Sequence, residues 1–202
     1  RMLMLRVLLV DDEPFIRQGI RILINWEQYG FKICGEASNG YEAITLLEAG
    51  EYDLIITDIR MPQMDGLELI TYTYKNISKD IRFILLSGFY DFEYAKKAIK
   101  YEVADYILKP VQREELIRAL EDYKEQYNQN VEKQKQMEFS EKIIFDSNLS
   151  RLIAGKSDQE SIRYVRQYLT DHTAVRYISI EYDSVQEQFL KLTDEEKHKA
   201  QR

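Results

Sequence analysis

Short apolar runs alternate with longer segments of helical character from the start of the chain to Pro110. Five apolar runs are strand-like, and the run that begins at Leu54 is typical of a strand buried on both faces of a parallel sheet. They lie at residues 5–10, 31–35, 54–57, 81–86 and 104–108. Strands that alternate with helices predict right-handed crossovers and a sheet covered by helices on both faces.

Four segments between the runs space their apolar residues at intervals of three and four, as an amphipathic helix does. Pro14 suits the first turn of the first helix, whose expected apolar face is Phe15, Ile16, Ile20, Leu23 and Ile24. The later helices are expected at residues 41–48 (Ala43, Ile44, Leu47), 67–74 and 92–101 (capped by Asp91; Tyr94, Ala95, Ala98, Ile99). This pattern predicts an α/β fold: a flavodoxin-like, doubly wound, five-stranded parallel sheet in the order 2-1-3-4-5.

Three aspartates follow two of the predicted strands. Asp11 and Asp12 end the first run, and Asp58 ends the third, within DLIITDIRMPQMDG at residues 53–66. In the predicted order these strands are neighbours, so the three carboxylates meet at the sheet edge where such folds bind ligands. Crowded like charges cost stability, whereas a hard cation such as Mg²⁺ takes oxygen ligands of this kind. In the alternative interpretation the aspartates only cap the following helix and loop.

Ser87 and Lys109 fall on the same predicted edge. Ser87 ends the fourth run before Gly88, and Lys109 ends the fifth before Pro110. A hydroxyl and an ammonium group beside a metal and a carboxylate form a site for a phosphoryl group. Alone, Lys109 would be a solvated strand end; the combination indicates phosphoryl chemistry.

The motifs LLVDDEP, DLIITDIRMPQMDG, ILLSG and DYILKPV, in this order and spacing, resemble the receiver (CheY-like) domain of two-component response regulators. The resemblance spans Met4 to Asp122. It implies that Asp58 is the phospho-acceptor and that a sensor histidine kinase supplies the phosphoryl group. It also implies a signalling switch that labels itself and slowly loses the label, and not an enzyme with a separate substrate.

The resemblance further assigns roles around Asp58. Asp12, Asp58 and the main-chain carbonyl of Arg60 would bind Mg²⁺ directly, and Asp11 would hold the water around the metal. Ser87 and Lys109 would contact the phosphoryl group. Tyr106 would be the aromatic switch, and the Lys109–Pro110 peptide is expected to be cis.

Within this family, the stretch ILLSGFYDFEYAKKAIKYEVADYILKPV most resembles a YesN-like subgroup with a C-terminal AraC-type helix-turn-helix domain. The chain would then be the N-terminal part of a transcription regulator, and only a domain outside these residues would bind DNA. Two other outputs stay open: a phosphorelay intermediate without DNA binding, and a receiver that controls an enzymatic domain. A third alternative is a flavodoxin-like Mg²⁺ phosphohydrolase, which would turn over many phosphoesters.

Helix-forming residues dominate between Pro110 and Gly155, and no Gly or Pro lies between them. One helix here would be about 60 Å long, and its start (Leu116, Ile117, Leu120) should cover the receiver core. From Leu120 on, residues spaced alternately by three and four form a weak seam, in which several positions are polar. This pattern favours either a short parallel coiled coil or a solvated linker helix with a break near residues 128–130. The seam comprises Leu120, Tyr123, Tyr127, Asn130, Gln134, Met137, Glu141 and Ile144.

We therefore expect a receiver domain at residues 1–122, a helical linker at 123–155 and the incomplete start of a middle or output domain at 156–202. The last part should hold a helix at 159–169, a strand at 175–182 and a polar helical tail, too few elements to bury a core alone. A homodimer is expected through the linker helix, through the surface of helix 92–101, strand 104–108 and the helix after Pro110, or through both.

Composition and charge further limit what the chain can bind and where it is expected to be found. The chain has 202 residues, 45% of them hydrophobic and 31% charged, which is ordinary for a globular protein. A net charge of -7 argues against unaided binding of nucleic acid, and no apolar run approaches the length of a membrane span. The single cysteine, Cys34, excludes an internal disulfide and fits a reducing, cytoplasmic location; in a predicted strand, its thiol is expected to be buried.

Overall fold

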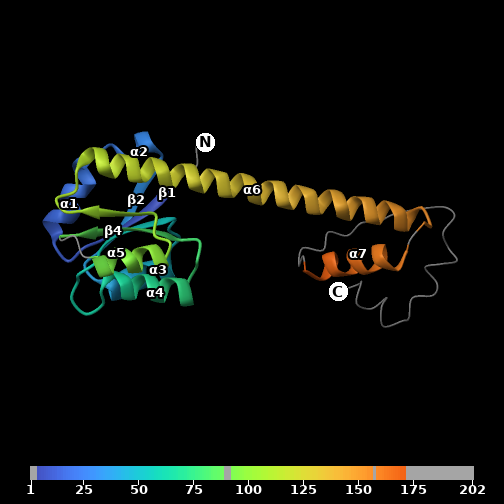
Figure 1. Cartoon of the computed structure of the whole chain (residues 1–202), viewed down its shortest axis with the longest axis horizontal. Helices are drawn as coiled ribbons and strands as arrows, with labels where there is room; N and C mark the ends of the chain where they lie inside the picture. Colours follow the sequence, from blue (N-terminus) through green and yellow to red (C-terminus); the bar gives the residue numbers. More distant parts are fainter. Residues whose placement is uncertain (1–3, 89–91, 157, 172–202) are drawn as a thin grey trace. The chain divides into compact units, whose positions relative to one another are not determined.

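The structure is a computed structural model that describes residues 4–88, 92–156 and 158–171 (Figure 1). The chain divides into two compact units, an α/β unit (residues 1–134) and a second unit (residues 135–202). None of the helices in the described ranges combines the length and apolar content that a membrane span requires.

Five parallel strands form one sheet in the order β2-β1-β3-β4-β5, which confirms the predicted flavodoxin-like fold. The strands are β1 (Leu5–Val10), β2 (Phe31–Ala37), β3 (Leu54–Asp58), β4 (Arg82–Ser87) and β5 (Asp105–Leu108). Each lies within two residues of its predicted run. The helices are α1 (Pro14–Leu23), α2 (Trp26–Tyr29), α3 (Gly40–Ala49), α4 (Gly66–Asn76), α5 (Phe92–Lys100), α6 (Arg113–Ile153) and α7 (Gln159–Asp171).

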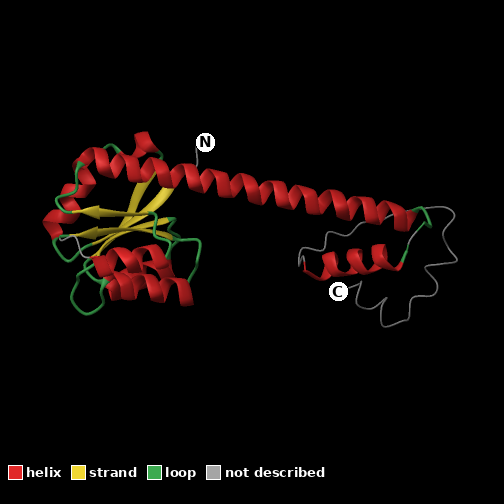
Figure 2. Ribbon diagram, in the orientation of Figure 1, coloured by secondary structure: helices red, strands yellow, loops and turns green. Residues whose placement is uncertain are grey.

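Helices cover both faces of the sheet (Figure 2). Alternate residues of a strand point to opposite faces, so β1 contributes to two cores. Leu5, Val7 and Leu9 pack with side chains of α1 and of the first turns of α6. Leu8 and Val10 pack with side chains of α3, α4 and α5. Burial on both faces explains why the central strands β1, β3 and β4 are apolar at nearly every position.

Three predicted burials are wrong. Phe15 is 85% exposed and Ile99 is 80% exposed. Each lies next to a residue that does face the sheet (Ile16 and Ala98), and a helix turns about 100° per residue, so the neighbour points away. Cys34 is exposed on edge strand β2, at the register shift where the pairing with β1 passes from Ile33 to Gly35. The expected cap at Asp91 and the side chain of Ala95 lie outside the described residues.

Helix α6 runs unbroken over 41 residues, so the break expected near residues 128–130 in one interpretation does not occur. Leu116 and Leu120 are fully buried, which confirms that the start of this helix covers the core. Tyr123 is buried too, and Tyr127 packs against the same core. The core of the α/β unit therefore takes up the first positions of the predicted seam, through Tyr127.

In the second unit, the end of α6 packs against α7. The rings of Phe145 and Tyr168 stack with centroids 4.3 Å apart. Gly155 adopts φ 67° after the helix and ends α6 as expected. Helix α7 confirms the helix predicted at 159–169, whereas the strand predicted at 175–182 and the helical tail lie outside the described residues.

Candidate functional site

Asp58 lies at the carboxyl end of the central strand β3. The strand is buried along its whole length, and Asp58 itself is 8% exposed. The main chain beyond Asp58 is fixed by two hydrogen bonds, from Ile59 N to the Leu86 carbonyl (3.0 Å) and from Gly66 N to the Ile59 carbonyl (2.9 Å). A carboxylate is thus held at the edge where open α/β sheets bind ligands.

Gly66 allows helix α4 to approach this strand end. A Cβ atom at Gly66 would clash with the main-chain oxygen of Asp58, and only glycine avoids this clash. The helix is fixed just before this point by a capping box, in which the Asp65 carboxylate accepts from Glu68 N and Glu68 accepts from Asp65 N. The turn after Asp58 is therefore closely packed.

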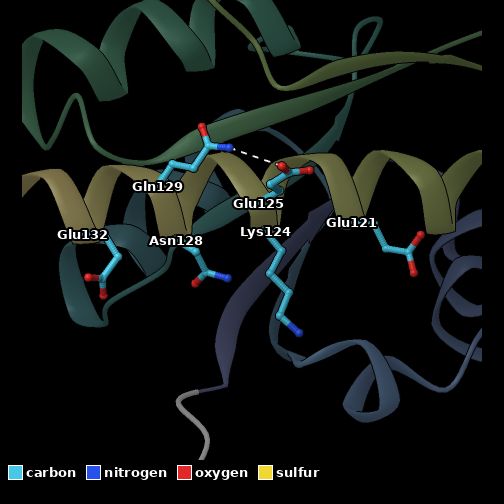
Figure 3. Close-up of a pocket in the computed structure, with 6 residues that line it drawn as sticks. All are labelled: Glu121, Lys124, Glu125, Asn128, Gln129 and Glu132. Atoms are coloured by element: carbon cyan, nitrogen blue, oxygen red, sulfur yellow. Dashed lines mark hydrogen bonds between the residues drawn. The ribbon is translucent and has the colours of Figure 1, made fainter.

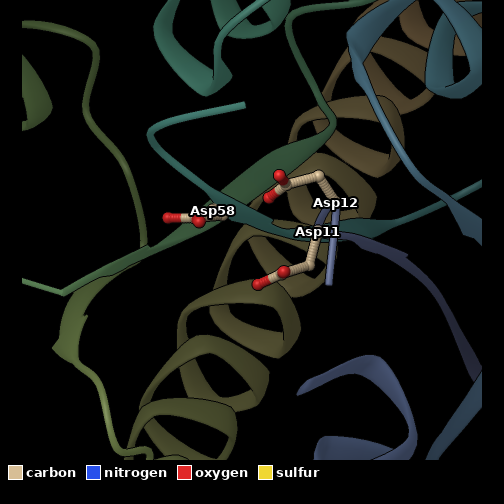
Figure 4. Close-up of side chains that lie close together, drawn as sticks. All are labelled: Asp11, Asp12 and Asp58. Carbon is tan, nitrogen blue, oxygen red and sulfur yellow. The ribbon is translucent and has the colours of Figure 1, made fainter. Parts of the chain in front are cut away.

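Asp11, Asp12 and Asp58 come together as predicted, with one carboxylate oxygen of each within 4.8 Å of the others (Figure 4). Their strands are neighbours in parallel register, Val10 opposite Thr57, so the following residues share the sheet edge. Asp11 is 1% exposed and is fixed by Asp11 N donating to the Ala37 carbonyl and by Oδ1 accepting from Glu13 N. Asp12 is exposed.

Lys109 neutralises part of this charge. Its Nζ lies 2.7 Å from Oδ2 of Asp58 and 2.7 Å from Oδ2 of Asp11. Lys109 N donates to the Ser87 carbonyl (2.8 Å), which ties the end of β5 to the end of β4. Three carboxylates against one ammonium leave the site negative.

Burial and charge perturb both members of the Asp58–Lys109 pair. Burial raises the pKa of Asp58 above its ordinary value; the hydrogen bond and charge of Lys109 oppose the rise, and the charge of Asp11 adds to it. Burial lowers the pKa of Lys109, but the attraction of the Asp11 and Asp58 carboxylates outweighs it, so the net pKa is raised. Lys109 is therefore a fixed cation at neutral pH.

The donor set fits a hard divalent cation. All three side chains offer oxygen, and the site keeps excess negative charge after Lys109 is counted. Oδ2 of Asp11 is buried and accepts no hydrogen bond of good geometry, although it lies beside Lys109. A buried carboxylate oxygen with unused acceptor capacity fits a bound cation or its water.

A cavity of about 190 Å³ opens at this edge. It is lined by Glu13, Asp58, Arg60, Ser87, Gly88, Tyr94 and Lys109. Ser87 and Lys109 thus face the same space as Asp58, as the strand ends predicted. The Arg60 guanidinium lies over the Tyr94 ring, 5.5 Å from its centroid, and forms one wall.

Tyr106 does not line this cavity. It is half-buried on β5, opposite Leu85 of β4, and packs against the core on the side of α3, α4 and α5. The Lys109–Pro110 peptide is cis, as expected.

Sequence reasoning missed three residues at the site. Glu13 and Tyr94 line the cavity, and Arg17 of α1 donates to the main-chain carbonyl of Asp11. The helical spacing that includes Tyr94 gives no sign that its ring reaches the cavity. The position of Arg17 one turn after Asp12 and Glu13 is the one sequence signal that could have found it.

A second hollow of about 500 Å³ lies along α6 (Figure 3). Its lining residues all come from this one helix, and two of them are bonded to each other, Gln129 donating to Glu125 (3.2 Å). Lys124 at its edge is already bonded to the Tyr29 carbonyl (2.8 Å). We assign no chemistry to this surface.

Comparison with known proteins gives the family of the α/β unit. The sequence matches the family model of the response regulator receiver domain over residues 7–121. It is 40% identical over 159 residues to the uncharacterized transcriptional regulatory protein YesN of Bacillus subtilis (strain 168), covering 75% of this chain and 43% of YesN. It is 40% identical over 114 residues to the transcriptional regulatory protein HptR of Staphylococcus aureus (strain NCTC 8325 / PS 47), covering 56% of this chain and 44% of HptR.

Two solved structures are similar. The REC domain of AraT, a response regulator from Geobacillus stearothermophilus, has a TM-score of 0.55 at 35% identity, covering 61% of this chain and 98% of that one. A two component transcriptional regulator AraC from Clostridium phytofermentans ISDg has a TM-score of 0.53 at 37% identity, covering 58% and 90%. The chain spans less than half the length of YesN and HptR.

Proposed function

The chain belongs to the family of response regulator receiver domains, and on that premise we propose that Asp58 accepts a phosphoryl group from a phosphohistidine of a sensor kinase. The observation that carries the proposal is the shared cavity of Asp58, Ser87 and Lys109 next to Asp11 and Asp12. A carboxylate nucleophile, a fixed cation, a hydroxyl and an acidic group suited to a metal meet in one space.

The reaction is an in-line displacement. A carboxylate oxygen of Asp58 forms a bond to phosphorus while the phosphorus–nitrogen bond breaks, and the electron pair leaves with the imidazole. Lys109 offsets negative charge on the transferring group, and the Ser87 hydroxyl donates a hydrogen bond to it. The product is an acyl phosphate on Asp58.

Mg²⁺ is the cation that fits this site. Asp12, Asp58 and the main-chain carbonyl of Arg60 would hold it, and Asp11 would hold its water. When bound, it supplies positive charge for the transferring phosphoryl group. Asp11 stays anchored through Oδ1 to Glu13 N, which leaves Oδ2 for this role.

Phosphorylation then acts as a switch. It adds about -1.5 to -2 charges and new acceptor oxygens at the cavity. Ser87 moves toward the phosphoryl group, and Tyr106 rotates into the space that Ser87 leaves. This changes the surface formed by α5, β5 and the start of α6.

The output is regulation of transcription. The support is the similarity to YesN and HptR, which are named transcriptional regulatory proteins, and to the AraC regulator structure. Contact with DNA belongs to an AraC-type domain outside these residues, which agrees with the acidic charge of this chain.

Dimerisation of the phosphorylated form is part of the proposal. Ile99 of α5 and Leu108 of β5 are exposed large apolar residues, and a two-fold dimer would place this surface against its own copy. On α6, Met137 and Ile144 are exposed beyond the part of the helix that the α/β unit buries. Both surfaces are available to a second copy.

The test is intact-mass measurement after incubation with acetyl phosphate and Mg²⁺, with and without EDTA. We expect one added phosphoryl group that requires the metal and is absent in Asp58→Ala. Asp80→Ala is the matched control, because Asp80 is exposed and outside the cavity, and it should label normally. Metal-independent labelling, or normal labelling of Asp58→Ala, would contradict the proposal.

A further inference from the structure

Arg17 links the acidic edge of the sheet to helix α1. Its side chain is 16% exposed and uses two separate nitrogens. Nη1 donates to the main-chain oxygen of Asp11, and Nε donates to Oε2 of Glu36 on β2 (3.3 Å). Arg21, one turn later, lies 3.0 Å from Oε1 of the same Glu36 but has no part in the contact to Asp11.

From this arrangement we propose that Arg17 is a positioning residue for the cation site, acting through the main chain of Asp11. The inference rests on the proposed function, because it concerns the same site. The Asp11 carbonyl belongs to the planar peptide unit that joins Asp11 to Asp12. Holding this oxygen fixes the plane from which the Asp12 side chain projects toward Asp58.

The other hydrogen bonds of this turn do not hold the peptide plane between Asp11 and Asp12, whereas Arg17 does. Asp11 N donates to the Ala37 carbonyl (3.1 Å), and Asp11 Oδ1 accepts from Glu13 N (2.9 Å). Both fix Asp11 itself, whereas Asp12 is exposed. The carbonyl contact of Arg17 is the one that acts on the link between the two acids.

An arginine suits this position for a geometric reason. Nε and Nη1 point in different directions within one rigid plane, so the guanidinium can hold a carbonyl and a carboxylate together. Glu36 precedes Ala37, whose carbonyl accepts from Asp11 N. Arg17 therefore closes a ring of contacts between the ends of β1 and β2.

Charge alone predicts the opposite effect. A guanidinium near a cation site repels the cation, so its removal would strengthen Mg²⁺ binding on electrostatic grounds. Positioning predicts that removal weakens binding. The sign of the change separates the two accounts.

The experiment compares Arg17→Met with Arg21→Met by calorimetric titration with Mg²⁺ alone. Both substitutions keep an unbranched stem and remove one positive charge that faces Glu36. We expect Arg17→Met to bind Mg²⁺ about 10-fold more weakly than the wild type, the scale of a lost supporting contact at a metal site. Arg21→Met should bind as the wild type does or more tightly.

Acetyl-phosphate labelling gives a second measurement. In Arg17→Met the Mg²⁺ concentration for half-maximal labelling should rise about 10-fold, with the rate at saturating Mg²⁺ within about twofold of the wild type. If urea unfolding shows that Arg17→Met is not folded, Arg17→Gln replaces it under the same criterion.

The outcomes are distinct. Equal or tighter Mg²⁺ binding by the Arg17 variant, with a normal wild type, would overturn the role of Arg17 and leave the proposed function intact. A wild type that binds no Mg²⁺ and takes no phosphoryl group would overturn the proposed function itself.

Discussion

The ammonium group of Lys109 lies 2.7 Å from a carboxylate oxygen of Asp58, so the end of β5 is joined to the end of β3 by an ion pair. The same ammonium lies 2.7 Å from Asp11. The positive charge that would offset a phosphoryl group is thus already in place, held by the proposed phospho-acceptor. A divalent cation bound at this site would compete with Lys109 for these oxygens.

Lys109→Met should make the fold depend on divalent cation. Removing one member of a half-buried ion network leaves its carboxylates uncompensated, and we expect a loss of about 2 kcal/mol in unfolding free energy without metal. Added Mg²⁺ should restore more stability to this variant than to the wild type, because Lys109 no longer competes for the oxygens. Urea unfolding with Mg²⁺ or EDTA measures both effects. Lys100→Met, at an exposed position on α5, should change neither.

Asp58→Asn should stabilise the protein at neutral pH. The pKa of Asp58 is raised in the folded state above its ordinary value of 3.8, so the wild type loses stability as pH rises through the folded pKa. The variant escapes this loss. We expect a gain in unfolding free energy on the order of 1 kcal/mol at pH 7. The gain should vanish below about pH 4, where the carboxyl group of Asp58 becomes protonated in the unfolded as well as in the folded wild type. Unfolding curves across this range check the trend; a gain that grows toward acid pH would contradict it.

Two glycine substitutions in helices should have opposite signs. Gly66→Ala brings a Cβ against the Asp58 carbonyl, and we expect a loss of about 3 kcal/mol together with weaker Mg²⁺ binding. Gly19→Ala, in α1, meets no atom within 4 Å and should gain about 0.5–1 kcal/mol from helix propensity. Thermal and urea unfolding of both variants measure the difference. Equal effects would mean that α4 can move away from Asp58.

Tyr123→Phe should loosen α6 from the α/β unit. The Tyr123 hydroxyl donates to the Asp53 carbonyl (2.8 Å) from a buried ring, so its loss removes a hydrogen bond between α6 and the start of β3 and leaves this carbonyl only Arg82 N as a donor (3.2 Å). We expect a cost of about 1 kcal/mol in unfolding free energy. Tyr41→Phe is the control, since Tyr41 is exposed and should change little. Faster amide exchange around residues 120–127 in Tyr123→Phe alone would locate the effect.

The sheet could be predicted because its central strands β1, β3 and β4 are buried on both faces, which leaves an apolar signal at nearly every position. The acidic group followed from strand order, since parallel strands end at one edge. Which helix residues are buried could be predicted less accurately. Phe15 and Ile99 match helical spacing, but whether they are buried depends on where the neighbouring elements lie.

Long-range side-chain contacts could not be predicted. Arg17 meets Glu36 only after β1 and β2 are paired, and its place one turn after Glu13 gives no sign of that contact. The short helix α2 was missed because four residues give too little periodicity, although Trp26 is buried there. The continuity of α6 was open because Asn128 and Asn130 weaken a helix without ending it.

Because α6 carries Tyr123 and Tyr127 into the core before it leaves the α/β unit, the chain can be recombined with another output only beyond these residues. A fusion joint at residue 122 would remove two aromatic rings from the packing, whereas a joint after Gln134 would keep it whole. A continuous helix also fixes the rotation of the segment after such a joint relative to the segment before it. An insertion of seven residues restores the downstream face to within about 20°, and an insertion of two nearly reverses it.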